Sequence, residues 1–184
     1  KEPWNFFNIR VDILNYEYEV KDENGDVIYT LLFNLADDNS GLEVEIGQEP
    51  TTSVELNIPS SVYFEEYDVT YDVVAIADYA FWFCDFTGPL TIPNSVTAIG
   101  NCAFYYCSGF NGTLTLPENI TSIGNEAFYY CSGFTGSLTI PNSVTSIGKS
   151  AFYRCSGFNG TLTLPENLTS IGNSAFYQCS GFNG

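Results

Sequence analysis

The second half of the chain carries a hydrophobic pattern that repeats every 24 residues. Prolines mark the period in one column and cysteines mark it in another: Pro93, Pro117, Pro141 and Pro165, then Cys107, Cys131, Cys155 and Cys179. The copies are close, because residues 109–131 and 157–179 differ at only three positions. A fixed period of this length predicts a solenoid, in which each repeat buries its apolar face against the next one.

Each repeat opens with a short alternation of polar and apolar residues, as in the sequence TLTLP at 113–117. Leu114 and Leu116 are expected to point inward and the threonines outward, as in a half-buried strand. Pro117 would end this strand because proline has no N–H for the ladder.

The rest of the repeat predicts a turn and a short buried segment. A second apolar spacing, Ile120 to Ile123, ends at Gly124, where we expect a bend with positive φ. The AFYYC sequence at 127–131 is expected to bury Ala, Phe and Cys over about one helical turn. Two internal phenylalanine ladders are predicted: Phe104, Phe128, Phe152 and Phe176, and Phe110, Phe134, Phe158 and Phe182.

The pattern therefore predicts a right-handed, β-rich solenoid of about five coils of 23–24 residues over residues 51–184. An insertion of ten or eleven residues within 63–72 interrupts its first coil. The chain contains no methionine, so we interpret it as a processed or excised piece.

Residues 1–50 do not repeat and are interpreted as an N-terminal all-β cap. Two strands, 16–20 and 27–33, would flank a hairpin turn at Asn24-Gly25. A polar outer face on this cap would keep the edge of the first coil from pairing with another molecule.

Charge and composition exclude several functions. The formal net charge is −17, and eighteen of the 22 acidic residues lie within 1–78, so nucleic acids and anionic membranes would be repelled. There is no histidine, which removes Ser-His and Cys-His catalytic pairs and the commonest zinc ligand. No apolar stretch is long enough for a membrane helix. We therefore expect no enzymatic activity, no cofactor, no metal site and no membrane insertion.

The repeat sequence resembles that of a known family. The segment LTIPNSVTSIG, followed by Ala-Phe and Cys within Leu138–Cys155, resembles the BspA-like, or Treponema pallidum type, leucine-rich repeat proteins. The resemblance covers Val54–Gly184. It implies a leucine-rich repeat fold in secreted or surface-attached bacterial proteins, frequent in Bacteroidetes, with adhesin-like roles in binding host proteins or other cells. It carries no shared catalytic site.

Outward-facing strand positions form a candidate protein-binding surface, which we name the threonine strip: Glu55, Asn57, Thr91, Thr113, Thr115, Ser137, Thr139, Thr161 and Thr163. Solenoids bind partners through such surfaces, so an extended host or microbial protein segment is the expected ligand. The alternative is that threonine is present only as a good former of exposed strands.

A second surface, the aromatic column, follows the buried phenylalanines: Trp82, Tyr105, Tyr129, Tyr153 and Tyr177. Its spacing is close to that of successive sugars in a glycan, so a carbohydrate-binding protein is an alternative function. The rings could instead lie along the solenoid with only their hydroxyls exposed, or contact a protein. A purely structural spacer is a further alternative.

The cysteines are interpreted as a column of buried, reduced thiols at Cys84, Cys107, Cys131, Cys155 and Cys179. Successive coils place them close together but with parallel side chains, which does not suit disulfides. Cys102 lies outside the column and is expected to be partly exposed. The acidic segments 22–26 and 37–41 are interpreted as turns rather than calcium sites.

The last coil has no predicted cover. Gly184 aligns with Gly112, Gly136 and Gly160, each of which precedes a strand. We expect the natural polypeptide to continue with more repeats or a cap. We also expect the 184-residue chain to form a tail-to-tail dimer through residues 161–184.

Overall fold

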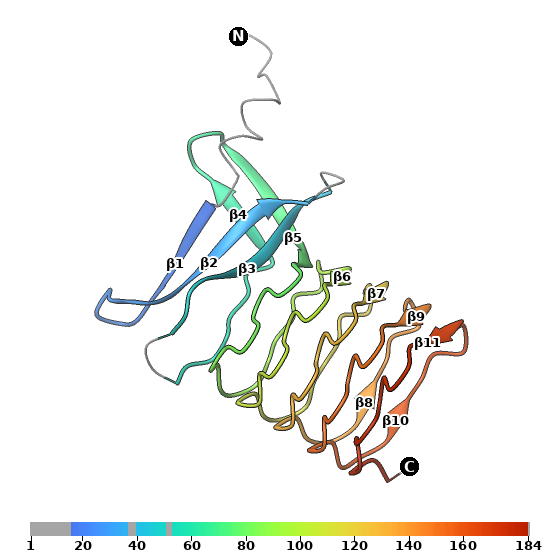
Figure 1. Ribbon diagram of the computed structural model, residues 1–184. Helices are drawn as coiled ribbons and strands as arrows, with labels where there is room; N and C mark the ends of the chain where they lie inside the picture. The colour runs from blue at the N-terminus through green and yellow to red at the C-terminus, as the bar shows by residue number, and fades with distance from the viewer. Residues whose placement is uncertain (1–15, 37–39, 51–52, 184) are drawn as a thin grey trace.

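The computed structural model describes residues 16–36, 40–50 and 53–183, and within these residues it contains strands and turns but no helix (Figure 1). The N-terminal strands are β1 (Tyr16–Lys21), β2 (Val27–Leu35), β3 (Leu42–Gln48), β4 (Ser61–Phe64) and β5 (Val69–Ile76). The coils add two-residue strands: β6 (Ala98–Ile99), β7 (Ser122–Ile123), β8 (Leu138–Thr139), β9 (Ser146–Ile147), β10 (Leu162–Thr163) and β11 (Ser170–Ile171). The predicted β-rich solenoid is confirmed.

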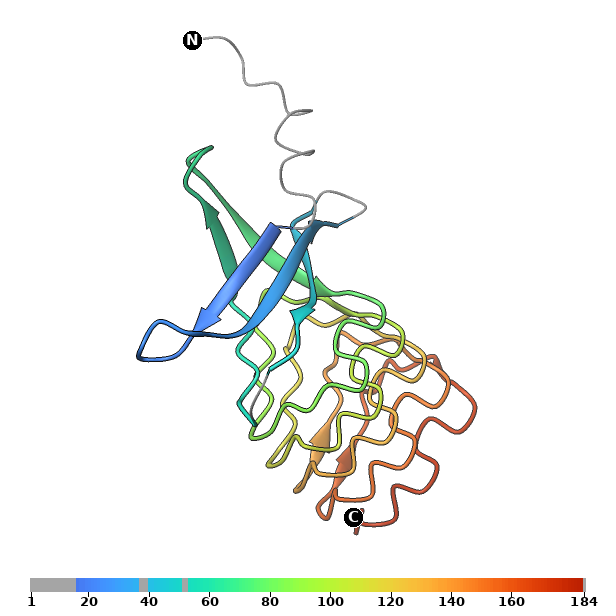
Figure 2. The same ribbon diagram turned by 60° about the vertical axis from the view of Figure 1, so that its left-hand side comes forward.

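One sheet joins the N-terminal strands to the solenoid. Its order is β1-β2-β3-β5-β6-β7-β9-β11, antiparallel among the first three strands and parallel from β3 onward. The inserted residues 63–72 lie in the antiparallel hairpin of β4 and β5. In Figure 2, β1 and β2 lie at the N-terminal end of the stacked coils. Tyr29 of β2 packs edge-on against Phe86, with 5.0 Å between ring centroids, and thereby covers the first coil.

The predicted hairpin turn is confirmed. Gly25 takes a φ of 89°, which glycine adopts without strain. The carboxylate of Asp22 accepts the backbone N–H groups of Asn24 and Asp26 at 2.8 and 3.0 Å and so closes the turn. These contacts hold the pKa of Asp22 below its ordinary value, the bond from Asp26 contributing most. Residues 37–39 of the second acidic segment lie outside the described residues.

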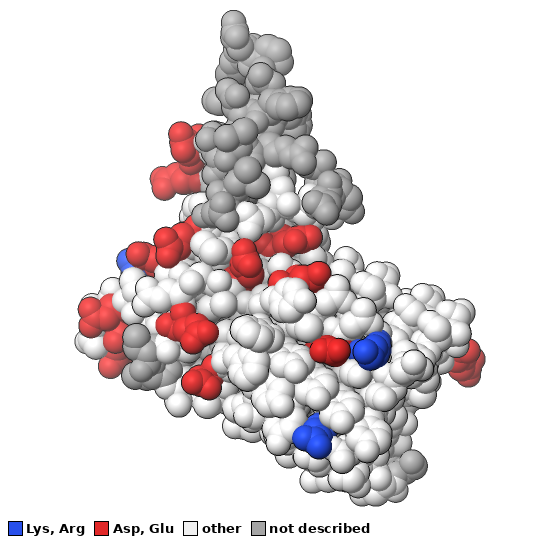
Figure 3. Space-filling view, viewed as in Figure 1, with Lys and Arg blue, Asp and Glu red and all other residues white. Residues whose placement is uncertain are grey.

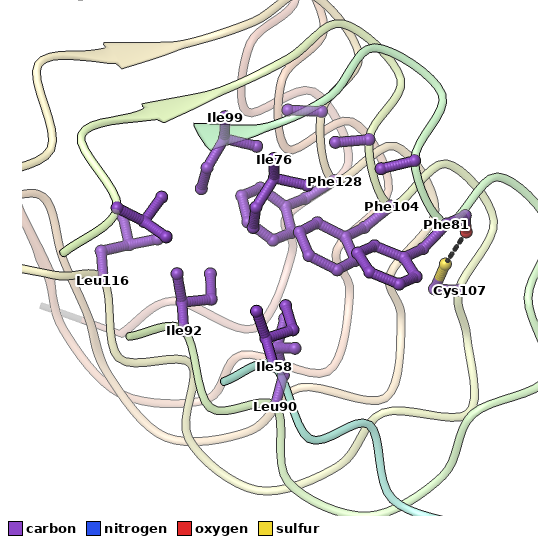
Figure 4. Packing of buried hydrophobic residues seen from close by; sticks show 14 of the residues in the cluster. Ile58, Ile76, Phe81, Leu90, Ile92, Ile99, Phe104, Cys107, Leu116 and Phe128 are labelled. Carbon is purple, nitrogen blue, oxygen red and sulfur yellow. Dashed lines mark hydrogen bonds between the residues drawn. The ribbon is translucent and has the colours of Figure 1, made fainter. Parts of the chain in front are cut away.

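The core consists of stacked columns, and both predicted phenylalanine ladders are present. Phe81, Phe104 and Phe128 stack face to face with 5.2 Å between successive centroids, as Figure 4 shows. The second ladder runs from Phe86 to Phe182 with separations of 5.2 to 6.5 Å. Such separations are favourable for aromatic pairs, so each coil is stabilised by the coil on either side.

The alternation in the TLTLP segments is confirmed, but the strands are shorter than predicted. Leu114 and Leu116 are buried and the threonines beside them are exposed. Regular pairing occurs only between β8 and β10, whereas earlier coils contribute single bridges. The longer ladder runs through the TSI segments instead, in β7, β9 and β11.

Two predictions about the turn were wrong. Gly124 does not take a positive φ; the residue with left-handed backbone is Glu126, with a φ of 57°. Glycine is required at 124 by close approach, because a Cβ there would lie 2.5 Å from the carbonyl carbon of Gly100. The AFYYC segment at 127–131 forms successive turns rather than a helical turn.

Each coil contains two left-handed residues that are not glycine, in two columns. The first comprises Tyr79, Cys102, Glu126, Ser150 and Ser174, and the second Phe83, Tyr106, Tyr130, Arg154 and Gln178. Backbone N–H groups here alternate in direction: Phe104 donates to Ala127 in the next coil, whereas Tyr105 donates back to Cys102. The left-handed residues accompany this alternation, at a cost of about 1–2 kcal/mol each.

Candidate binding surfaces

The threonine strip is brought together as predicted. All nine of its residues are exposed, and parallel pairing aligns Asn57 with Thr91, Thr91 with Thr115, and Thr139 with Thr163. Its only charged residue is Glu55. The strip is therefore a nearly neutral surface of hydroxyl and amide groups.

The strip hydroxyls are largely unused inside the protein. Within the described residues, the hydroxyls of Thr115, Thr139 and Thr163 make no hydrogen bond, whereas the Oγ of Ser137 accepts the N–H of Thr161 at 3.0 Å. Strand hydroxyls without an internal partner remain able to donate to and accept from a ligand.

A second outward face was missed by the sequence interpretation. Strand register places Ala75, Ala98, Ser122, Ser146 and Ser170 in one row across the continuous sheet. A shallow hollow of about 580 Å³ lies at its N-terminal end, between Glu43 and Ser122. The available signal was the repeated T-S-I alternation, which is only three residues long.

Threonines on this second face differ from those of the strip. Thr121 and Thr169 donate their hydroxyls to the carbonyls of Thr97 and Thr145 in the preceding coils, at 3.1 and 2.7 Å. These hydroxyls join neighbouring coils. Threonine hydroxyls on the second face thus bond to neighbouring coils, whereas those of Thr115, Thr139 and Thr163 in the strip do not.

The aromatic column is stacked from coil to coil. Ring centroids lie 4.7 Å apart for Tyr105 and Tyr129, 4.6 Å for Tyr129 and Tyr153, and 5.0 Å for Tyr153 and Tyr177, with nearly parallel planes. Trp82 lies less regularly on Tyr105, at 6.4 Å. Burial, followed by the neighbouring Tyr153, raises the pKa of Tyr129 above its ordinary value.

This stacking weighs against the carbohydrate alternative. A sugar ring packs on the face of an aromatic ring, and both faces of Tyr129 are occupied by its neighbours in the column. Only the first and last members, Trp82 and Tyr177, are strongly exposed. The expected repeat of one sugar for each ring therefore has no free ring faces in the middle of the column.

A second aromatic column, also missed from the sequence, runs beside the first. Phe83 stacks on Tyr106 at 4.8 Å, and Tyr106 stacks on Tyr130 at 4.7 Å. In the next coil Arg154 replaces the aromatic ring and places its guanidinium carbon 5.9 Å from the centroid of Tyr130. The signal was the aromatic pair, rather than a single aromatic residue, after each of the first three buried phenylalanines.

The cysteine column has a specific geometry. The thiols of Cys107, Cys131 and Cys155 donate to the carbonyls of Phe81, Phe104 and Phe128 in the preceding coils, at 2.8, 2.9 and 3.0 Å. Figure 4 shows the first of these bonds, from Cys107 to Phe81. All six cysteines are free thiols, and Cys102 is half-buried as expected.

Burial keeps the thiols in this column protonated. It raises the pKa of Cys84 to about 12, with smaller contributions from the carboxylates of Glu49 and Asp85, and it raises the pKa of Cys179 to about 11. The pKa of Cys131 lies well above its ordinary value for the same reason. Because the thiolate is the reactive form, these cysteines act as small apolar groups.

Carboxylates gather over the N-terminal strands and the first coil, and most of the remaining solenoid surface in Figure 3 is uncharged. Among the described residues, no three His, Cys, Asp or Glu side chains converge as metal ligands. The described part of the chain also has no helix that could cross a membrane.

Comparison with known proteins finds similarity to leucine-rich repeat proteins. The family model for the BspA type leucine rich repeat region matches residues 74–183 in six copies. A leucine-rich repeat protein from Bacteroides ovatus is 31% identical, with a TM-score of 0.71 over 91% of this chain and 40% of its own length. The chain thus spans less than half of that protein. No curated protein matches the sequence.

Two more distant structures share the fold. A leucine-rich repeat protein of T. pallidum is 24% identical, with a TM-score of 0.69 over 90% of this chain and 69% of its own. A leucine rich cell surface protein from Faecalibacterium prausnitzii is 23% identical, with a TM-score of 0.52 over 91% and 54%.

Proposed function

Because the chain belongs to the BspA-type leucine-rich repeat family, we propose that it is a non-enzymatic, adhesin-like binding module, secreted or held at a bacterial cell surface. Its ligand is an extended segment of a host or microbial protein, bound along the threonine strip. A similar fold in a protein described as a cell surface protein supports the location.

The observation that carries this proposal is the set of unused hydroxyls at Thr115, Thr139 and Thr163. They recur once in each coil, so they can meet successive polar groups of an extended chain. Hydrogen bonds between neutral groups depend little on ionic strength, so binding through this strip should persist at high salt.

The test uses matched lysine variants on the two faces. Fluorescently labelled protein is added to host epithelial cells and to bacteria, before and after the cells are treated with protease. Substituting Thr115, Thr139 and Thr163 with Lys should abolish adhesion, and protease treatment should do the same. Substituting the exposed Ser122, Ser146 and Ser170 with Lys adds the same charge to the second face and should leave adhesion intact.

Two outcomes would contradict the proposal. Equal adhesion by the threonine variant and the unchanged protein would exclude the strip. Adhesion that survives protease but is lost after glycosidase treatment would assign the ligand to carbohydrate.

A further inference from the structure

Both aromatic columns begin in the first coil, where they form an exposed patch. Trp82 and Phe83, the first members of the two columns, meet edge-on and are 49% and 48% exposed; Tyr79, three residues before Trp82, is 60% exposed, and we name these three residues the aromatic cluster. Large apolar side chains that are gathered and exposed in this way are typical of interaction sites.

The cluster presents open ring surface. Phe83 stacks one face on Tyr106 and meets Trp82 edge-on at 4.6 Å. No ring of the described residues covers its other face. β3 lies beside the first coil, where Ile46 donates its N–H to the carbonyl of Ala80 at 2.9 Å, and Phe83 remains 48% exposed.

The surroundings of the cluster are negatively charged. Glu49 directly follows β3, the strand that is hydrogen-bonded to Ala80, and Asp85 lies two residues after Phe83; both are exposed. Asp78 precedes the cluster directly. The sequence contains no Lys or Arg between Lys21 and Lys149, so no cation of the first coil neutralises these carboxylates.

The same columns already hold a cation three coils further along. Arg154 occupies the column position of Phe83, and its guanidinium carbon lies 5.7 Å from the centroid of Tyr153 and 5.9 Å from that of Tyr130. A guanidinium is planar and weakly hydrated, which suits it to stacking on aromatic rings better than an ammonium group. The chain itself thus shows which group these columns accept where no ring follows.

We propose that the aromatic cluster binds an arginine side chain presented by a protein partner. The guanidinium stacks on the open faces of Phe83 and Trp82, and the carboxylates of Glu49 and Asp85 attract its charge. This inference rests on the proposed function only in that the partner is a protein, and it does not involve the threonine strip.

The probe is a hexa-arginine peptide, with hexa-lysine of equal charge as the comparison, measured by isothermal titration calorimetry on the full chain at low salt. Hexa-arginine should bind more tightly than hexa-lysine. The double variant Trp82→Ala with Phe83→Ala should weaken hexa-arginine binding by about tenfold or more. Tyr177→Ala, at the other end of the aromatic column, is the matched control and should leave binding unchanged.

The results that would overturn the proposal are equally specific. Equal affinity for the two peptides would show attraction by charge alone, and unchanged binding by the double variant would exclude the cluster. Phe83→Leu keeps the apolar volume and removes the ring, so weaker binding by this variant shows the effect without a cavity. A threonine strip that proves inactive in cell adhesion would overturn the proposed function while leaving the peptide result intact.

Discussion

Two segments with almost the same sequence, 109–131 and 157–179, have very different surroundings. Ile123 is 3% exposed and its counterpart Ile171 is 48% exposed; Leu116 is 4% exposed and Leu164 is 39% exposed. The difference is the neighbouring coil, because the first segment is covered on both sides and the second on one side. In this solenoid a side chain is buried by the next coil rather than by its own.

The N-terminal end shows the same rule from the opposite direction. The first coil is covered by β2 and β3, with Tyr29 on Phe86 in place of a preceding phenylalanine. The last described coil has no such cover, and its phenylalanines stack on one neighbour only, as Phe182 does on Phe158. Coils with similar sequences therefore need not contribute equally to the free energy of unfolding.

The largest expected effect of this asymmetry is on the oligomeric state of the protein. The 184-residue chain should form a tail-to-tail dimer through the exposed residues of the last coil, because repulsion between the acidic N-terminal strands disfavours the head-to-head form. Light scattering over a concentration series measures this. Phe182→Glu should restore the monomer; a chain that stays monomeric at millimolar concentration, or a dimer unaffected by Phe182→Glu, would show that the exposed coil is tolerated.

The next effect is on the free energy of unfolding. Phe128→Ala removes a ring that is stacked on both faces and should cost about 3–5 kcal/mol. Phe176→Ala, at the equivalent position of the last coil, should cost less than half as much, because that ring stacks on Phe152 alone. Urea unfolding of the two variants makes the comparison. Equal losses would mean that burial by the next coil contributes little.

The cost of left-handed backbone conformation should be smaller, and it should be equal in the two segments. It therefore distinguishes strain within one residue from burial by the neighbouring coil. Glu126 and Ser174 share left-handed backbone, with φ of 57° and 60°. Valine at either position should be less stable than glycine by about 1–2 kcal/mol, because a β-branched side chain clashes in this conformation. Thermal unfolding of the four variants provides the measurement, and a penalty confined to position 126 would show that the strain depends on packing.

The smallest effect concerns pH. Because burial raises the pKa of Cys131 in the native state, the native protein keeps this thiol protonated where the unfolded chain loses the proton. Stability from this group is therefore complete at pH values well below 9, and it is lost as the pH rises through the ordinary thiol pKa, by about 1 kcal/mol at pH 10. Urea unfolding at pH 8 and pH 10 should show a smaller difference for Cys131→Ala than for the unchanged protein. Cys102→Ala, at a half-buried thiol, is the control, and an equal reduction by both variants would contradict the interpretation.

Sequence reasoning succeeded where a property repeats in every coil. The phenylalanine and cysteine columns and the exposed threonines follow from period and residue type. Outside the coils, the hairpin turn at Gly25 follows from its Asn-Gly sequence. It failed where the structure depends on contact between coils. The two-residue strands such as β7 are too short to show a pattern, and the need for glycine at 124 arises from the approach of Gly100, which no single repeat reveals.

The candidate surfaces show the same division. The threonine strip was found because alternation marks exposed strand positions, whereas the stacking of Tyr129 between its neighbours could not be read from its spacing alone. The second aromatic column was missed because Arg154 and Gln178 break its residue type, although they keep its backbone conformation.

The two left-handed columns also bear on how the protein can diversify. Their ten residues include Tyr, Cys, Glu, Ser, Phe, Arg and Gln, but no Val, Ile or Thr. The backbone at these positions disfavours β-branched side chains and otherwise accepts large, small, charged or apolar ones. Nine of the ten lie at least partly at the surface, the exception being Ser150. Substitutions in these columns, including those at Tyr79 and Phe83 of the aromatic cluster, can therefore change the exposed side chains one coil at a time without altering the stacked core.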